Sequence, residues 1–313
     1  MRRVTVVGSG VVGLSVAHEF ALAGDEVTVV ADADVAHSVS TVAAAVWFPY
    51  LTTGSPAVTH WLQRSLDRYR QIARTPAAGV DLRLGTVVER RVDPDRSWMS
   101  VVAGAALVPP RDLPAGALSA VRATVPVVTT GAYGQWLTAR CRDVGVRFEF
   151  RSVASVDEFA DSADLVVVAA GLRSGALLGD DDTVVPVRGQ VVRLENPGLT
   201  EWWIDDDNPA GLTYVVPRRD DIVCGGVAEF GATSLELDAA TERGILERAT
   251  ALVPALAGLR VVSRAAGLRP ARPTVRLEHV PGRAVPVIAC YGHGGSGVTL
   301  SWGCAEAVVE LAG

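Results

Sequence analysis

A glycine-rich segment near the start of the chain has the spacing of a phosphate-binding turn. Residues 8–13 read Gly-Ser-Gly-Val-Val-Gly, between a β-branched run at Arg3–Val7 and an apolar helical pattern. In such a turn Gly8 permits the tight bend, Gly10 lets backbone amides approach a pyrophosphate, and Gly13 lets helix and strand pack closely. The N-terminus of the helix then faces the phosphates, so the segment predicts nucleotide binding.

An acidic residue completes this pattern. Asp32 lies about twenty residues beyond the glycines, at the end of a second predicted strand from Glu26 to Val30. At that place its carboxylate can accept hydrogen bonds from ribose hydroxyls. Strand, glycine turn, helix, second strand and acid together predict a dinucleotide-binding βαβ unit, and these residues alone leave both NAD and FAD open.

The residues after the second strand favour a flavin. An NAD enzyme of this type usually continues with further βα repeats. This chain continues instead with a polar loop at 37–41 and the run Ala-Ala-Ala-Val-Trp-Phe-Pro-Tyr at 43–50. Small side chains suit close contact with a flat ring. We expect Trp47 and Phe48 to help form the wall of the pocket, although packing alone would explain both.

The composition favours a protein that acts on small molecules. The chain has 313 residues, of which 49% are hydrophobic and 20% charged, enough for a large core and two interlocked domains. Its net charge of −6 argues against a nucleic-acid surface. No window reaches the ~18 uninterrupted apolar residues of a membrane helix. The glycine turn also interrupts any signal-peptide pattern, so we expect a first strand that is retained.

The cysteines predict no special chemistry. Cys141, Cys224, Cys290 and Cys304 are widely spaced and form no CxxC pair, so neither a disulfide framework nor a zinc site is indicated. We expect buried thiols, no bound metal and a reduced, cytoplasmic setting.

Six segments, in order along the chain, resemble the D-amino acid oxidase family. They are VAAAVWFPY at 42–50, ADLVVVAAGLRSGAL at 163–177, VRGQVVRLE at 187–195, GLTYVVPR at 211–218, AAGLRPARPTVRLE at 265–278 and YGHGGSGVTLSWGCA at 291–305. The resemblance implies an α/β fold in which separated segments form a Rossmann-like FAD-binding domain. A substrate domain of α+β type, with a mixed β-sheet, completes the chain. The implied FAD-binding domain comprises residues 1–50, 130–180 and 268–313, and the substrate domain comprises 51–129 and 181–267.

The pattern of the remaining residues agrees with this division. Helical spacing occurs at 57–75 and 132–143, β-branched or alternating runs occur at 184–195, 212–227 and 260–266, and a helical pattern begins at Gly297.

The resemblance implies FAD-dependent oxidative deamination of a D-amino acid, by hydride transfer to flavin N5. The products are a 2-oxo acid, ammonia and, with O2 as the electron acceptor, hydrogen peroxide. A glycine or sarcosine oxidase and a dehydrogenase with another acceptor remain alternatives. A flavin-binding regulator without turnover would have no use for the substrate-binding residues.

Three residues match the family's substrate contacts. Arg269 matches the arginine that binds the substrate carboxylate, and its planar fork suits two parallel hydrogen bonds. Tyr214 matches the tyrosine that donates to the same carboxylate, and Gly295 matches the glycine whose carbonyl accepts from the amine. We interpret Arg272 and Arg276 as structural ion pairs.

The flavin contacts implied by the resemblance extend the glycine motif. They are Gly8, Ser9, Gly10, Val11, Val12, Gly13, Asp32, Ser40, Thr41, Ala44, Ala45, Val46, Val153, Gly171, Gly294, Gly295, Ser296, Gly297, Val298 and Thr299. Thr299 is the candidate donor to the flavin pyrimidine, where a helix N-terminus would stabilise negative charge on the reduced ring. We interpret His293 as structural because the mechanism needs no strong side-chain base.

Departures from the family pattern bear on the substrate and its entrance. The stretch 204–210 is short and acidic and lacks the second tyrosine of vertebrate members, with Ala210 near its place. This predicts an open entrance and product release that does not wait on a lid. Ser296 replaces an aromatic residue that is common there. No cation occurs at 224–230, so a neutral or apolar D-amino acid is the expected substrate.

The chain ends without a peroxisomal signal, which favours a bacterial cytoplasmic enzyme. The family resemblance weakly favours a homodimer.

Overall fold

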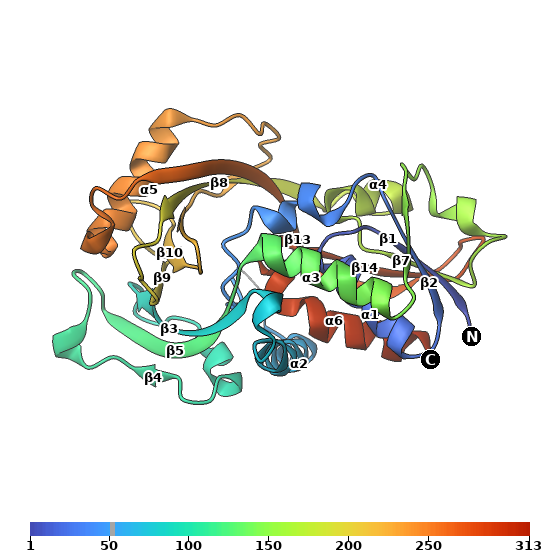
Figure 1. Cartoon of the computed structure of the whole chain (residues 1–313), viewed down its shortest axis with the longest axis horizontal. Coiled ribbons are helices and arrows are strands. Elements are labelled where there is room, and N and C mark those ends of the chain that lie inside the picture. The colour runs from blue at the N-terminus through green and yellow to red at the C-terminus, as the bar shows by residue number, and fades with distance from the viewer. Residues whose placement is uncertain (51–53) are drawn as a thin grey trace.

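The structure is a computed structural model that describes residues 1–50 and 54–313. One mixed sheet runs along the molecule, with helices on its faces (Figure 1). Its strands are β1 (Arg3–Val7), β2 (Glu26–Ala31), β3 (Val80–Glu89), β4 (Ala106–Leu107), β5 (Ser119–Val128), β6 (Arg147–Phe150), β7 (Leu165–Val168), β8 (Val185–Glu195), β9 (Trp202–Asp205), β10 (Thr213–Pro217), β11 (Asp221–Gly225), β12 (Glu229–Phe230), β13 (Val261–Val280) and β14 (Val287–His293). Its helices are α1 (Val11–Leu22), α2 (Pro56–Ile72), α3 (Thr130–Asp143), α4 (Ser174–Leu178), α5 (Ala239–Leu252) and α6 (Gly297–Ala312).

The strand order is β4-β5-β3-β9-β10-β11-β8-β13-β14-β7-β1-β2-β6, and β12 pairs with β8 beside this path. From β14 to β6 all neighbouring strands are parallel. Strand β7 is buried along its whole length, as its run of Leu and Val predicts for a parallel sheet covered on both faces. The predicted βαβ unit is confirmed as β1, α1 and β2.

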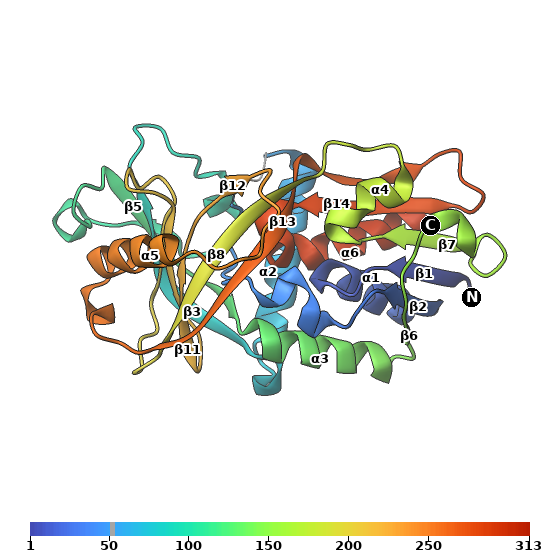
Figure 2. The ribbon, with the colours of Figure 1, turned by 90° about the horizontal axis from the view of Figure 1, so that it is seen from above.

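Two long strands connect the parallel end of the sheet to the other end. Strand β13 pairs antiparallel with β8 over residues 261–271 and with β14 over 271–280. Both strands cross the middle of the molecule in Figure 2. Beyond β8 most pairings are antiparallel, and β3 and β9 form the parallel exception. Side chains in the middle of β13 therefore lie where the two ends of the sheet meet.

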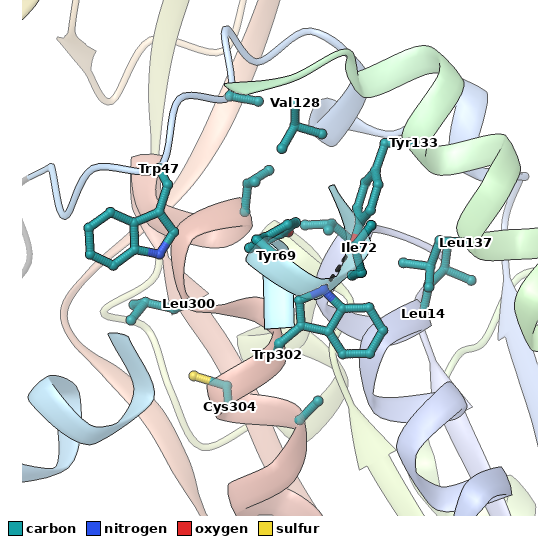
Figure 3. Packing of buried hydrophobic residues seen from close by; sticks show 14 of the residues in the cluster. Leu14, Trp47, Tyr69, Ile72, Val128, Tyr133, Leu137, Leu300, Trp302 and Cys304 are labelled. Carbon is teal, nitrogen blue, oxygen red and sulfur yellow. Dashed lines mark hydrogen bonds between the residues drawn. The ribbon is translucent and has the colours of Figure 1, made fainter. Parts of the chain in front are cut away.

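Helices α1, α2 and α6 pack together around the main hydrophobic core. In α6, Trp302 is buried and its indole nitrogen donates to the Tyr133 hydroxyl at 2.8 Å (Figure 3). One residue on, a Cβ at Gly303 would lie 2.1 Å from the Trp61 carbonyl oxygen, so α2 and α6 approach at backbone distance. The Gly303 amide also donates to the Ser65 hydroxyl. Helix α2 falls within 51–129 of the predicted substrate domain yet packs on α6, and the domain division stays a prediction.

The other predicted elements are confirmed with small shifts of their ends, except that the strand predicted at 260–266 continues to Val280. Helices α2, α3 and α6 occupy the three helical patterns, and strands β8, β10, β11 and β13 occupy the β-branched runs. All four cysteines are buried free thiols, and Cys304 packs in the core beside α2 (Figure 3). Within the described ranges, no helix combines the length and apolarity that crossing a membrane requires.

Candidate active site

A cavity of about 590 Å³ opens at the carboxyl ends of the parallel strands. Its wall includes residues 7–12 at the end of β1, 31–34 at the end of β2, 169–173 after β7 and 292–295 at the end of β14. In open α/β sheets this edge is the usual place for ligands. The cavity continues along β8, β10 and β13, so one space spans the two ends of the sheet.

The glycine turn forms one end of the cavity. Gly8 has a φ of 123°, and a Cβ there would lie 2.4 Å from the Ala169 carbonyl oxygen. A Cβ at Gly13 would lie 2.0 Å from the Gly8 carbonyl oxygen. Close packing therefore requires both glycines. The Val11 amide at the start of α1 donates to the Ser40 hydroxyl at 3.1 Å, beside Gly10.

Asp32 lines the same end and is ion-paired with Arg173, which follows β7. Arg173 also donates to the Val153 carbonyl at 2.9 Å. Its hydrogen bond to Asp32 holds the pKa of that carboxyl below its usual range. Sequence reasoning selected Asp32, Val153 and Gly171 but missed Arg173, although it lies in the quoted segment 163–177.

The small-residue run lies along the middle of the cavity. Ala44, Ala45, Val46 and Phe48 line the wall, and Ala45 has a φ of 57°, a left-handed conformation that is rare outside glycine. Trp47 does not line it, which corrects the expectation from sequence. Its side chain is buried in the hydrophobic core and its amide donates to the Pro126 carbonyl at 2.8 Å (Figure 3).

Arg269 and Tyr214 meet at the other end of the cavity. Arg269 projects from β13 and Tyr214 from β10, and both line the wall. Arg269 Nη1 donates to the Val227 carbonyl at 3.0 Å. Among the described residues, no carboxylate lies within ion-pair distance of Arg269. Burial raises the pKa of Tyr214, and the charge of Arg269 partly opposes this shift.

Glycines form the surface on which these side chains lie. A Cβ at Gly189 would be 2.4 Å from Arg269 Nη2, and one at Gly225 would be 2.1 Å from Tyr214 Cζ. At Gly295 a Cβ would lie 2.9 Å from Tyr50 Cδ1. The arginine and both tyrosines thus pack directly against backbone, and larger residues at these three positions would displace them.

Tyr50 was not selected from the sequence as a site residue, although it ends the quoted segment 42–50. It lines the cavity against Gly295, and its carbonyl accepts from the Ser296 hydroxyl at 2.9 Å. Burial raises the pKa of Tyr50, while the charge of Arg269 lowers it. No local sequence pattern identifies Tyr50 as a site residue, because its place depends on a contact with Ser296, which lies 246 positions away.

The predicted flavin donor Thr299 lines the cavity at the start of α6, but its hydroxyl is engaged. It donates to the Phe48 carbonyl at 3.0 Å and lies 3.3 Å from the Phe48 amide, from which it accepts. Thr299 therefore joins the loop at 48–50 to α6, and its backbone amide stays at the N-terminus of the helix.

Three of the predicted cofactor residues lie outside the cavity wall. Gly13 packs against the glycine turn, Ser296 is fully buried behind Tyr50, and the Thr41 hydroxyl donates to the Ser38 carbonyl at 2.8 Å. These three residues contact residues of the cavity wall but do not line it. The other predicted residues line it: Arg269, Tyr214, Gly295, Gly8, Ser9, Gly10, Val11, Val12, Asp32, Ser40, Ala44, Ala45, Val46, Val153, Gly171, Gly294, Gly297, Val298 and Thr299.

Arg272 and Arg276 are structural ion pairs, as the sequence interpretation expected. Arg272 binds Asp181 at 2.9 Å, and Arg276 binds Asp180 at 2.8 Å and the Tyr291 hydroxyl at 2.7 Å. His293, interpreted as structural, lies on the cavity wall, and its Nε2 has no hydrogen-bond partner among the described residues.

Comparisons with known proteins agree with this geometry. The family model described as FAD dependent oxidoreductase matches residues 3–311. A D-amino-acid oxidase from Rubrobacter xylanophilus is 45% identical, covering 99% of this chain and 96% of the relative. A D-amino-acid oxidase from Streptomyces coelicolor is 37% identical with the same coverages, and human D-aspartate oxidase is 32% identical, covering 99% and 94%. The structure of glycine oxidase from Bacillus cereus matches with a TM-score of 0.82 at 21% identity over 99% and 94% of the two chains, which supports the fold.

Proposed function

This chain belongs to the D-amino acid oxidase family of FAD-dependent oxidoreductases, and we propose that it oxidises neutral or apolar D-amino acids. The proposed products are a 2-oxo acid, ammonia and hydrogen peroxide. The family establishes FAD as the cofactor and amino acid oxidation as the class of reaction. The choice of substrate and of oxygen as acceptor belongs to the proposal.

The cavity fits FAD at the end formed by the glycine turn. A Cβ at Gly8 would clash with backbone, and the open turn leaves the N-terminus of α1 facing a phosphate position. Asp32 would accept from the ribose, and the small residues 44–46 would lie along the ring. When bound, FAD supplies a hydride acceptor at N5 and returns the electrons to oxygen.

The observation that carries the proposal is the guanidinium of Arg269 in the cavity, which has no carboxylate partner among the residues that the structure describes. Among the described residues it donates to the Val227 carbonyl and lies beside the Tyr214 hydroxyl, which leaves most of its donors available. A substrate carboxylate would occupy this fork through two parallel hydrogen bonds, and the Tyr214 hydroxyl would donate to the same carboxylate. The Gly295 carbonyl would accept from the amine. These three contacts orient the α-carbon, and orientation supplies most of the catalysis in a hydride transfer.

The residues around Tyr214 support a neutral or apolar side chain. Ile204 and Leu212 line this part of the cavity, and the segment 224–230 contributes no cation. Among the described residues that line the cavity beside Tyr214, Arg269 is the one cation, and the proposal assigns it to the α-carboxylate. A side-chain carboxylate would therefore lack a second cation in the wall, which separates the proposed specificity from that of a D-aspartate oxidase.

Anaerobic mixing of the holoenzyme with amino acids tests the proposal. We expect D-alanine and D-methionine to bleach the flavin band, each L-enantiomer to leave it unchanged, and readmission of air to restore the band with release of peroxide. Bleaching by glycine or sarcosine but not by D-methionine would replace the proposal with a glycine-type oxidase. Reoxidation by a quinone but not by air would replace oxygen as the acceptor.

A further inference from the structure

Three consecutive aspartates begin at the last residue of strand β9, next to a residue that lines the substrate end of the cavity. Ile204 lines the cavity, and Asp205, Asp206 and Asp207 follow it directly. Strand β9 pairs with β10 so that Ile204 lies opposite Tyr214. The three aspartates therefore follow directly after the residue that pairs with Tyr214, a proposed substrate contact.

Arginines neutralise two of these three carboxylates. Asp205 is fully buried and receives two hydrogen bonds from Arg90, at 2.8 and 2.7 Å. Asp207 forms an ion pair with Arg91. Asp206 has no cation within 4 Å among the described residues. Burial, followed by the charge of Asp207, raises the pKa of Asp206, as expected for a carboxylate without a direct counter-ion.

Asp206 lies two residues beyond the wall residue Ile204 and is not itself part of the wall, but its charge acts on a side chain that is. It raises the pKa of the Tyr50 phenol, which lines the cavity and packs against Gly295. The positive charge of Arg269 lowers the pKa of the same phenol. Tyr50, in the wall of the substrate end, is thus acted on by a positive group suited to the α-carboxylate and by the carboxylate of Asp206, which has no ion pair among the described residues and is opposed only by the more distant charge of Arg91.

We propose that Asp206 determines side-chain specificity by placing a negative charge without a direct counter-ion beside the substrate end of the cavity. D-amino acids with cationic side chains are then oxidised in preference to neutral side chains of similar length, and acidic side chains are disfavoured. This inference rests on the proposed function and extends its substrate class from neutral to cationic D-amino acids. Like charges repel and opposite charges attract, with partial screening by solvent.

Matched substrate pairs test the inference in the holoenzyme. We compare kcat/KM for D-arginine with D-citrulline, and for D-glutamate with D-glutamine, because each pair differs chiefly in side-chain charge. In Asp206→Asn the ratio of D-arginine to D-citrulline should fall about fivefold and the ratio of D-glutamate to D-glutamine should rise about fivefold. The control Asp220→Asn removes an exposed carboxylate between β10 and β11, at the far end of the hairpin from Tyr214, and should leave both ratios unchanged.

Ionic strength provides a second measurement that needs no variant. Raising salt should bring the D-arginine to D-citrulline ratio of the wild-type enzyme toward that of Asp206→Asn, because salt screens a partly exposed charge. Ratios that are the same in wild type and Asp206→Asn would overturn the inference while D-citrulline oxidation still supports the proposed function. Absence of oxidation of every D-amino acid, with FAD bound, would overturn the proposed function itself.

Discussion

Two stretches of strand β13 hold their arginines in opposite ways. Arg269 lies in the cavity with one hydrogen bond to a carbonyl and no carboxylate partner among the described residues. Seven residues on, Arg276 is buried and bonded to Asp180, Glu278 and the Tyr291 hydroxyl. One strand therefore carries a cation that is satisfied within the fold and another that is available to a ligand.

This difference predicts that, on the same strand, Arg276 contributes to the stability of the fold and Arg269 to ligand binding. Removing a group that is already paired in the fold leaves its buried partners without a counter-ion, so the free energy of unfolding falls. Removing Arg269 breaks no ion pair among the described residues, so its loss should appear in substrate binding and catalysis. The two arginines thus give matched variants with opposite expected signatures.

The largest effect should follow Arg269→Met. We expect kcat/KM for D-methionine to fall roughly 1000-fold, because a carboxylate that loses a paired arginine typically loses 2–5 kcal/mol of binding. Arg269→Lys should recover a small part of this loss, since an ammonium lacks the planar fork. Thermal unfolding and FAD titration serve as controls and should change little. A variant with nearly normal kcat/KM would remove Arg269 from the site.

Arg276→Met should give the opposite result. Asp180 and the buried Asp181 would lose a counter-ion, and the free energy of unfolding should fall by about 3 kcal/mol. Urea unfolding measures this loss. Activity per folded, FAD-loaded molecule should stay near the wild-type value. Lost activity with unchanged stability would show that the ion-pair cluster takes part in catalysis.

Gly189→Ala tests how the backbone positions Arg269. The added methyl group would meet the guanidinium, whose Nη2 lies 2.4 Å from the Cβ position, and the flexible side chain would move aside. We expect kcat/KM to fall about tenfold, chiefly through KM, with little change in the melting temperature. Gly131→Ala is the control because nothing lies within 4 Å of its Cβ position. Equal effects of the two substitutions would refute this positioning role.

The smallest expected effect is the pH dependence of the ion-pair cluster. Burial opposes ionisation of Asp181, but hydrogen bonds from Thr183, Tyr291 and Arg272 outweigh it and lower its pKa. A carboxyl whose pKa is lower in the folded state stabilises the fold above its unfolded pKa of about 3.9, and this contribution disappears as pH falls further. Urea unfolding between pH 6 and 2 should therefore show the stability advantage of wild type over Asp181→Asn begin to fall below about pH 4 and fall further toward pH 2. An advantage that stays constant from pH 5 down to pH 2 would contradict this explanation.

Local sequence patterns were sufficient to predict the glycine turn, the helix and the acidic residue at the nucleotide end of the cavity. The glycine turn, α1 and Asp32 lie within about thirty residues, where strand and helix periodicity determine their relative places. Arg173 was missed because it reaches Asp32 from a segment 141 positions away. Its ion pair depends on the alignment of β7 with β1, which no local pattern encodes.

The substrate end required tertiary information. The family resemblance selected Arg269 and Tyr214, which lie on different strands and meet only because β8 and β11 place them at the same cavity. Trp47 and Thr299 show the limits of the same reasoning. The loop at 46–50 turns back onto β5 and α6, which buries the indole and engages the threonine hydroxyl with Phe48.

The central claim is that Arg269 receives the carboxylate of the substrate, and equilibrium titration with a carboxylate that cannot be oxidised tests it directly. Benzoate and its neutral analogue benzamide are added to wild-type and Arg269→Met holoenzymes while the flavin spectrum is recorded. We expect benzoate to perturb the wild-type spectrum and to compete with D-methionine, benzamide to bind at least tenfold more weakly, and Arg269→Met to lose the difference between the two ligands. Equal affinity of wild type and Arg269→Met for benzoate would contradict the account.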